Sequence, residues 1–267
     1  MSGESFEPRC AVVLAGRRGT DDPLADADGA PHRALLDIEG EPMLLRVVRC
    51  LLGRKGLDRV FVNIDAPELL DAYPEWRDLA QQGRVQIILS TDSPSRSVLE
   101  SLEAAGLDEA PVLVTTADHA LLDDAMLDEF LAGCAQNPAD LSLAMVPRAS
   151  IVARFPEAKR TYLPFRDESY SGANLFFFRT PNAKKAALFW RRVENDRKKP
   201  WRIARAFGLW SLILFVTKRL DLAGGMRRAS LAIGAEVSAI PLTIAEAAVD
   251  VDKVEDLVLV RKILSER

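Results

Sequence analysis

The chain has 267 residues, of which 48% are hydrophobic and 28% are charged, and its formal net charge is −4. These proportions are close to the averages of soluble globular proteins and exclude a disordered or fibrous chain. No apolar run is long enough to cross a membrane, and the N-terminus lacks the apolar stretch of a signal peptide. Three cysteines are too few for a disulfide framework or a zinc site. We therefore expect a cytoplasmic, reduced protein with one large domain or two small ones.

The first half of the chain alternates between short aliphatic runs and amphipathic stretches of helical length. The aliphatic runs predict strands at 10–15, 59–64, 85–89, 112–116, 141–146, 173–178 and 236–240. The amphipathic stretches predict helices at 43–52, 67–82, 95–105 and 123–134. The first four strands are continuous apolar runs, which is typical of strands buried on both faces of a parallel sheet. The alternation predicts an α/β fold with a mostly parallel sheet flanked by helices.

After Pro147 this alternation ends. Residues 148–172 are rich in arginine, proline and tyrosine, and we expect a loop or an antiparallel excursion there. Further helices are predicted at 182–195, 201–216 and 254–264. The pattern favours one domain with an elaborated, helical second half over two separable domains.

The first predicted strand ends in a glycine turn, Leu14-Ala15-Gly16-Arg17-Arg18. Backbone N–H groups in such a turn can line an anion site, and guanidinium groups suit phosphate oxygens. No GxGxxG or GxxxxGK[ST] pattern is present. The glycine alone therefore does not distinguish a phosphate site from an ordinary turn with two solvated arginines.

The stretch 32–44 reads HRALLDIEGEPML. Together with LAGR at 14–17 it resembles the signature of the MobA-like NTP transferases, the sugar-phosphate and molybdopterin nucleotidyltransferase group. The resemblance implies a Rossmann-like (GT-A-like) fold, a triphosphate bound by the first loop, and nucleotide contacts from Arg33. This sequence departs from the family pattern twice, because Arg17 replaces a glycine and Arg33 replaces the usual lysine. Arginine keeps the positive charge but is a planar fork rather than a point charge.

The resemblance also divides the chain. It implies one nucleotidyltransferase domain over 1–267, with a nucleotide-binding half at about 9–147 and an acceptor-binding, helical half at about 148–267. In the first half it assigns nucleotide binding to Leu14, Ala15, Gly16, Arg17, Arg18 and Arg33. Arg18 and Arg33 are in addition expected to act in catalysis.

Two aspartates match the positions where the family holds Mg²⁺. Asp118 follows the strand predicted at 112–116, at the carboxyl end where α/β proteins bind ligands. By itself it could equally cap the next helix. Near the C-terminus, the stretch AVDVDKVEDL at 248–257 is similar to the family's closing element, whose leading aspartate corresponds to Asp252. Asp250 would share a face with Asp252 if this segment is extended.

The resemblance thus implies that Asp118 and Asp252 hold Mg²⁺, with Asp118 counted among the catalytic residues. His119 follows directly, but a zinc site would need more histidines than the 2 in the chain. We expect a structural role for His119.

Two further stretches contribute site candidates. The sequence SYSGANLF at 169–176 is similar to a family strand that lines the acceptor pocket, which makes Gly172 and Asn174 acceptor-binding candidates. A bulge or turn leading into a core strand explains them equally well. Ser97, in the helix predicted at 95–105, is a candidate for contacting the base, against the alternative of a serine that simply caps the helix.

Residues 184–219 carry 11 basic and 2 acidic side chains, and they include three of the four tryptophans. A basic stretch with interleaved aromatic residues can lie on an anionic membrane surface. It could also bind a phosphorylated acceptor or form a lid, a dimer contact or a solvated face. The net charge of the whole chain is no indication of nucleic-acid binding.

These observations predict a Mg²⁺-dependent nucleotidyltransferase that joins an NMP moiety, with CTP slightly favoured as donor, to a phosphorylated small-molecule or lipid-precursor acceptor and releases pyrophosphate. One alternative is a nucleotide-binding regulatory module without turnover. The other is a nucleotide-sugar glycosyltransferase of related fold, which would need an Asp-x-Asp where this chain has Thr116-Ala117-Asp118. The sequence leaves the acceptor, the base and the oligomeric state open.

Overall fold

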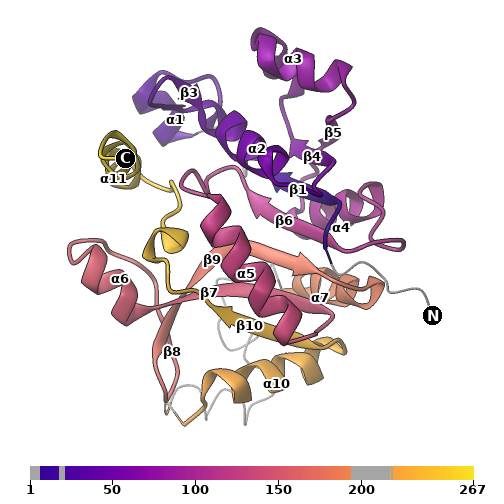
Figure 1. Ribbon diagram of the computed structural model, residues 1–267, viewed down its shortest axis with the longest axis vertical. Helices are drawn as coiled ribbons and strands as arrows, with labels where there is room; N and C mark the ends of the chain where they lie inside the picture. The colour runs from indigo at the N-terminus through magenta and orange to yellow at the C-terminus, as the bar shows by residue number, and fades with distance from the viewer. Residues whose placement is uncertain (1–6, 18–21, 194–216, 218) are drawn as a thin grey trace.

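The computed structural model describes residues 7–17, 22–193, 217 and 219–267. Its main sheet runs in the order β10-β7-β9-β6-β1-β4-β5, and β8 adds to β9 (Figure 1). The strands are β1 (Cys10–Leu14), β4 (Arg59–Ile64), β5 (Val85–Leu89), β6 (Val112–Thr116), β7 (Leu141–Pro147), β8 (Leu163–Pro164), β9 (Ser169–Phe178) and β10 (Val237–Pro241). The pairs β1–β4, β1–β6, β4–β5 and β7–β10 are parallel, whereas β9 is antiparallel to both of its neighbours. The predicted α/β class with a mostly parallel sheet is confirmed.

Helices cover both faces of this sheet. They are α1 (Pro23–Asp28), α2 (Met43–Gly53), α3 (Pro74–Gln81), α4 (Pro94–Ala104), α5 (Asp124–Gln136), α6 (Arg148–Arg154), α7 (Lys184–Val193), α10 (Leu222–Ile233) and α11 (Val254–Ser265). A two-stranded ribbon, β2 (Asp37–Ile38) with β3 (Glu41–Pro42), precedes α2. Side chains alternate across β1, as the period of a strand requires. Ala11 and Val13 join the core formed with α2, α5 and α11, while Val12 joins the core formed with α4 and α7.

The structure corrects four sequence predictions. The helix expected at 67–82 breaks at Tyr73, because Pro74 favours an extended residue before it and can only start a new helix. The segment 148–172, expected to be a loop or an antiparallel excursion, contains α6 in addition to the antiparallel pair of β8 with β9. The stretch after the glycine turn, for which no element was predicted, contains α1, whose first turn is capped by Asp22. The amphipathic helix α10 has no counterpart among the predictions.

Other boundaries agree closely. The helix expected at 182–195 appears as a short 3-10 turn followed by α7. The helix expected at 201–216 lies outside the described residues. In the described part of the chain, no helix combines the length and the apolarity that a membrane span needs.

The parallel strands bring three loops to one edge of the sheet. Gly16 follows β1, Asp65 follows β4 and Asp118 follows β6 by two residues. Because these three strands are neighbours and point the same way, their carboxyl ends meet at this edge. This is the edge at which open α/β sheets bind ligands.

Candidate active site

The glycine turn after β1 is anchored on both sides. The backbone N–H of Ala15 donates to the carbonyl oxygen of Asn63 at 2.8 Å. Gly16 packs so closely against the Ser90 hydroxyl that a Cβ at this position would clash with it. The absence of a side chain therefore follows from the close approach of the β5 end. Arg18, predicted to contact the nucleotide and to act in catalysis, lies outside the described residues.

Asp65 organises this turn. Its carboxylate accepts the backbone N–H and the side-chain Nε of Arg17, both at 2.9 Å, and lies 3.1 Å from His32 Nε2. The ring of His32 is fully buried, and its Nδ1 accepts the backbone N–H of Ala34 at 3.0 Å. The Nε2 atom must therefore carry the proton that is donated to Asp65.

These donors set the pKa of Asp65. Partial burial alone would raise it, but the hydrogen bonds from the Arg17 backbone, from His32 and from the Arg17 side chain outweigh burial and hold the pKa at about 2. The side chain of Arg17, expected to surround a triphosphate, thus uses its Nε on the protein itself. Among the described residues its two terminal nitrogens form no hydrogen bond, and triphosphate binding by Arg17 stays a prediction.

Arg33 joins the helix α1 to the C-terminal segment. Its Nε and one terminal nitrogen hold Asp22 as a fork, at 2.9 and 3.2 Å. The other terminal nitrogen, Nη1, lies 3.4 Å from Oδ1 of Asp252. A lysine could not make these contacts together, which gives a physical reason for arginine at this position.

Three carboxylates gather beside Arg33. Asp118, Asp250 and Asp252 each offer an oxygen, and these oxygens lie within 4.8 Å of one another. The backbone N–H of Val251, between two of them, donates to the carbonyl oxygen of Asp118 at 3.0 Å. We call these three residues the acidic triad. A set of three carboxylate oxygens fits Mg²⁺, which prefers oxygen ligands.

The charges of the acidic triad are only partly compensated, by Arg33 beside Asp252 and by Arg160 on Asp250. Burial raises the pKa of Asp118 to about 6, and the charges of Asp250 and Asp252 add to this effect. Hydrogen bonds from Thr116 and from Asn174 Nδ2, the latter at 3.0 Å, act in the opposite direction on its Oδ1. Burial and the charge of Asp252 also raise the pKa of Asp250. A bound cation would offset the repulsion among these carboxylates.

The structure also describes other residues that were predicted to bind the nucleotide or the acceptor. The hydroxyl of Ser97 accepts the backbone N–H of Thr91 at 2.8 Å and so helps to shape the loop before α4. Gly172 is exposed on β9, and Asn174, two residues on, bonds Asp118. Leu14 ends β1 and is partly exposed. The roles of these residues in binding remain predictions.

His119 is fully buried, and burial lowers its pKa to about 4, so the ring is neutral at pH 7. Its Nδ1 lies 3.3 Å from the Thr115 hydroxyl. It contributes no atom to the acidic triad found among the described residues.

Sequence reasoning missed Asp65, His32 and Asp22, and it named Asp250 only as a neighbour of Asp252. The signal for Asp65 was available, because it follows a buried parallel strand just as Asp118 does. Asp22 and His32 carried no such signal. Their roles depend on a loop returning to the sheet edge, and local sequence does not specify that return.

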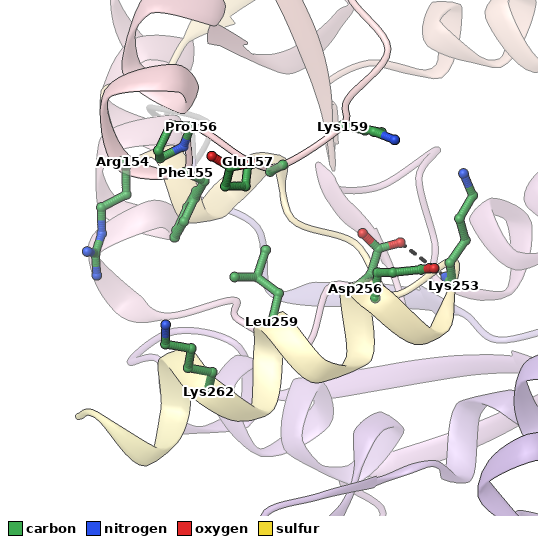
Figure 2. Close-up of a pocket in the computed structure, with 11 residues that line it drawn as sticks. Arg154, Phe155, Pro156, Glu157, Lys159, Lys253, Asp256, Leu259 and Lys262 are labelled. Carbon is green, nitrogen blue, oxygen red and sulfur yellow. Dashed lines mark hydrogen bonds between the residues drawn. The ribbon is translucent and has the colours of Figure 1, made fainter.

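A pocket of about 550 Å³ lies between the turn after α6 and the helix α11 (Figure 2). Phe155 and Leu259 point toward each other across its middle. Its cations are Arg154, Lys159, Lys253 and Lys262, and its acidic residues are Glu157, Glu255 and Asp256. Lys253 follows Asp252 directly, so one end of the pocket adjoins the acidic triad.

Comparison with known proteins identifies relatives of this chain. A family model of the MobA-like NTP transferase domain matches residues 11–165. No protein of curated function matches the sequence. A hypothetical transferase structure from Thermus thermophilus is 30% identical, with a TM-score of 0.77, and the match covers 94% of this chain and 100% of that one.

Two more distant structures share the fold. The CMP:2-keto-3-deoxy-manno-octonic acid synthetase complexed with CTP is 15% identical, with a TM-score of 0.56, over 97% of this chain and 99% of that one. The 4-diphosphocytidyl-2C-methyl-D-erythritol synthase from Anaerococcus prevotii is 11% identical, with a TM-score of 0.57, over 96% of this chain and 97% of that one.

Proposed function

The chain belongs to the MobA-like NTP transferase domain family, and from this premise we propose that it joins the NMP moiety of an NTP to a phosphorylated acceptor and releases pyrophosphate. The observation that carries the proposal is the acidic triad at the sheet edge that also bears the glycine turn. A triphosphate on the turn would have its α-phosphorus near a cation held by Asp118, Asp250 and Asp252. The acceptor phosphate would then attack in line, and pyrophosphate would leave.

The protein's own residues bind, orient and neutralise charge in this reaction, since phosphoryl-type transfers need little covalent chemistry from the enzyme. The backbone N–H groups of Ala15 and Arg17 are bound to Asn63 and Asp65, so we propose that the N–H of Gly16 and the terminal nitrogens of Arg17 bind the nucleotide phosphates. Arg33 extends Nη1 from its fork on Asp22 toward the acidic triad, and it can neutralise charge on the leaving pyrophosphate. Arg18 is proposed to act with it.

The acidic triad supports a divalent cation, proposed to be Mg²⁺. When bound, this cation would polarise phosphate oxygens and offset the charge that develops on them. Thr116 and Asn174 occupy Oδ1 of Asp118, which leaves Oδ2 for the cation. Asp252 has an exposed side chain beside Arg33, so its carboxylate would hold the cation on the side that is open to solvent.

For the acceptor, we propose that the anionic group approaches from β9 and from the cationic pocket of Figure 2. Gly172 leaves open space on β9, with no atom within 4 Å of where a Cβ would lie. Lys159, Lys253 and Lys262 have no acidic partner within ion-pair distance in the described ranges, so their charges are available to a phosphate. Two proteins of this fold carry cytidine in their names or ligands, which supports a modest preference for CTP.

We also propose peripheral contact with anionic membrane through residues 184–219. Of these, the described helix α7 exposes Leu188 and Trp190 beside Arg191 and Arg192. The protein should co-sediment with vesicles containing phosphatidylserine but not with phosphatidylcholine vesicles, and the bound fraction should fall as salt screens the charges. Sedimentation with neither contradicts membrane contact, and equal sedimentation with both contradicts a contact that depends on anionic lipid.

A panel of ATP, GTP, CTP and UTP, each with and without Mg²⁺, tests nucleotide binding by thermal unfolding. A nucleotide that binds only the native state raises the unfolding temperature. We expect the largest rise with CTP plus Mg²⁺ and a smaller rise in EDTA. Pyrophosphate release with candidate phosphorylated acceptors then separates an enzyme from a regulatory module. Binding without any release of pyrophosphate favours the regulatory module.

A further inference from the structure

Arg160 has a side chain that is only 8% exposed, although it lies between α6 and β8 and its neighbour Lys159 is exposed. Burying a guanidinium group is costly unless acidic partners and hydrogen bonds compensate it. The partners of Arg160 therefore explain how its side chain can be buried.

Two carboxylates receive this guanidinium group. Nη1 donates to Oδ1 of Asp250 at 2.6 Å, and Nη2 donates to Oδ1 of Asp256 at 2.9 Å. Asp250 belongs to the acidic triad and Asp256 to the first turn of α11. The remaining nitrogen, Nε, is buried with no hydrogen-bond partner in the part of the chain that the structure describes. All observed bonding of Arg160 is thus directed at these two carboxylates.

Asp256 links Arg160 to the backbone just before α11. Its Oδ2 accepts the N–H of Lys253 at 3.1 Å and that of Asp252 at 3.3 Å. Figure 2 shows this carboxylate above the start of α11, with its bond to Lys253. One arginine therefore fixes Asp250 directly and, through Asp256, the backbone that carries Asp252.

We propose that Arg160 is a positioning residue for the metal site, holding two of its three carboxylates at the spacing a divalent cation needs. The inference rests on the proposed function, because it takes the acidic triad to be a metal site. Three carboxylates within 4.8 Å repel one another, and Arg160 opposes this repulsion by its bonds to Asp250 and Asp256. Arg160 occupies one oxygen of Asp250, so the other oxygen is left for the cation. It touches neither nucleotide nor acceptor in this scheme.

The test measures Mn²⁺ binding to the protein without nucleotide, by the electron paramagnetic resonance signal of free Mn²⁺. Residues that orient metal ligands typically change affinity by about 10- to 100-fold when they are replaced, and we expect a loss in this range for Arg160→Gln. Arg160→Lys keeps the charge but cannot reach both carboxylates as a fork, so it should weaken Mn²⁺ binding by about tenfold.

The matched control is Arg54→Lys. Arg54 is also largely buried, at 20% exposure, and it pairs with Asp128 on α5 instead of with the acidic triad. This substitution disturbs the ion pair between Arg54 and Asp128, away from the acidic triad, and should leave Mn²⁺ affinity unchanged. If Arg54→Lys weakens Mn²⁺ binding as much as Arg160→Lys does, the effect is general loosening and the proposal is overturned.

Asp256→Asn provides a second variant in case loss of Arg160 prevents folding. It retains the pair between Arg160 and Asp250 but weakens the hold on the backbone before α11, and it should weaken Mn²⁺ binding several-fold, below the loss in Arg160→Gln. Circular dichroism checks folding in each case. Parental Mn²⁺ affinity in Asp256→Asn, or in folded Arg160→Lys, overturns the positioning role.

Asp118→Asn distinguishes a failure of the proposed function from a failure of the role proposed for Arg160. If it leaves the Mn²⁺ affinity of the parent unchanged, the acidic triad is not the metal site and the proposed function fails. If it abolishes binding while the Arg160 variants bind like the parent, only the role of Arg160 fails. With nucleotide and acceptor present, raising the Mn²⁺ concentration should restore turnover in Arg160→Lys, because a positioning defect is one of metal affinity.

Discussion

Asp65 and Asp118 follow the two strands that flank β1, at the same edge of the sheet, yet their pKa values are shifted in opposite directions. Asp65 accepts bonds from the Arg17 backbone, the Arg17 side chain and His32, and its pKa falls to about 2. Asp118 is buried near two other carboxylates, and its pKa rises to about 6. Two residues of one type, in equivalent places in the fold, are thus a satisfied anion and an unsatisfied one.

The difference distinguishes a carboxylate that stabilises the fold from one that is a candidate ligand at this edge of the sheet. The charge of Asp65 is balanced within the chain, so it can fix the glycine turn whether or not a ligand is bound. The charge of Asp118 is balanced only if something positive arrives. A carboxylate whose donors outweigh its burial therefore indicates a structural role. A carboxylate whose donors are outweighed by burial and by neighbouring carboxylates, as in Asp118, indicates a ligand site.

The largest expected effect comes from removing the charge of Asp118. Asp118→Asn keeps the size and the bonds to Thr116 and Asn174 but removes a ligand of the proposed cation. Pyrophosphate release should fall by about 10³-fold, as for the loss of a main electrostatic contribution to a transition state. Asp65→Asn serves as the comparison and should lose far less. Near-parental turnover in Asp118→Asn would remove the distinction between the two aspartates.

The same substitutions should shift stability in opposite directions in EDTA at pH 7.5. Because folding raises the pKa of Asp118, its charged form destabilises the folded protein above pH 6, and Asp118→Asn should gain about 3 kcal/mol. The penalty appears as the pH rises through about 6 and is absent below about pH 4. Denaturant unfolding at pH 7.5 and below about pH 4 measures the gain in the free energy of unfolding. A loss of stability in Asp118→Asn at pH 7.5 contradicts the argument.

Asp65→Asn should cost about 1 kcal/mol at pH 7.5, because folding lowers the pKa of this group and solvent around the exposed residue screens part of the effect. That contribution is fully present above about pH 4 and is lost as the pH falls through about 2. The cost should therefore shrink when unfolding is repeated near pH 3. A cost that does not depend on pH would mean that Asn at this position disrupts packing, not charge.

The smallest effect concerns Arg33, which lies between the two regions. Arg33→Lys keeps a positive charge but loses the fork on Asp22, so NTP binding should weaken only a few-fold. Arg33→Ala should weaken it about tenfold or more, since it removes a charge-assisted contact. Calorimetry with NTP and Mg²⁺ measures both. Parental affinity in both variants would show that Arg33 is no phosphate ligand.

How far the sequence predicts this site depends on the range of the interactions involved. Asp118 and the strand before it are predictable, because a buried aliphatic run specifies its own strand and the residue after it lies at the sheet edge. Asp252 was found through a family resemblance rather than through its spacing. The grouping of Asp250 with these two could not be derived, because it depends on Val251 bonding to the carbonyl oxygen of Asp118.

The fold shows the same limit. The seven main strands were placed within a few residues, but their order and the antiparallel direction of β9 were not predicted. Arg160 lay in a segment expected to be a loop or an antiparallel excursion, and its burial depends on two carboxylates some 90 residues further along the chain. Patterning of nearby residues carries no information on such a pair.

The position of β9 has a consequence for how the chain folds. β7 is made before β9 but has no direct pairing with β6, because β9 separates them. The parallel strands of the first half therefore remain an incomplete sheet until residues 169–178 insert, and only then does Asn174 reach Asp118. Long-range pairing of this kind is slow, since the closure of the loop precedes any contact it gains. We expect Asp118, the proposed metal ligand, to acquire its final orientation late, and a chain that ends after β7 also lacks Asp250 and Asp252, so it should bind no cation there.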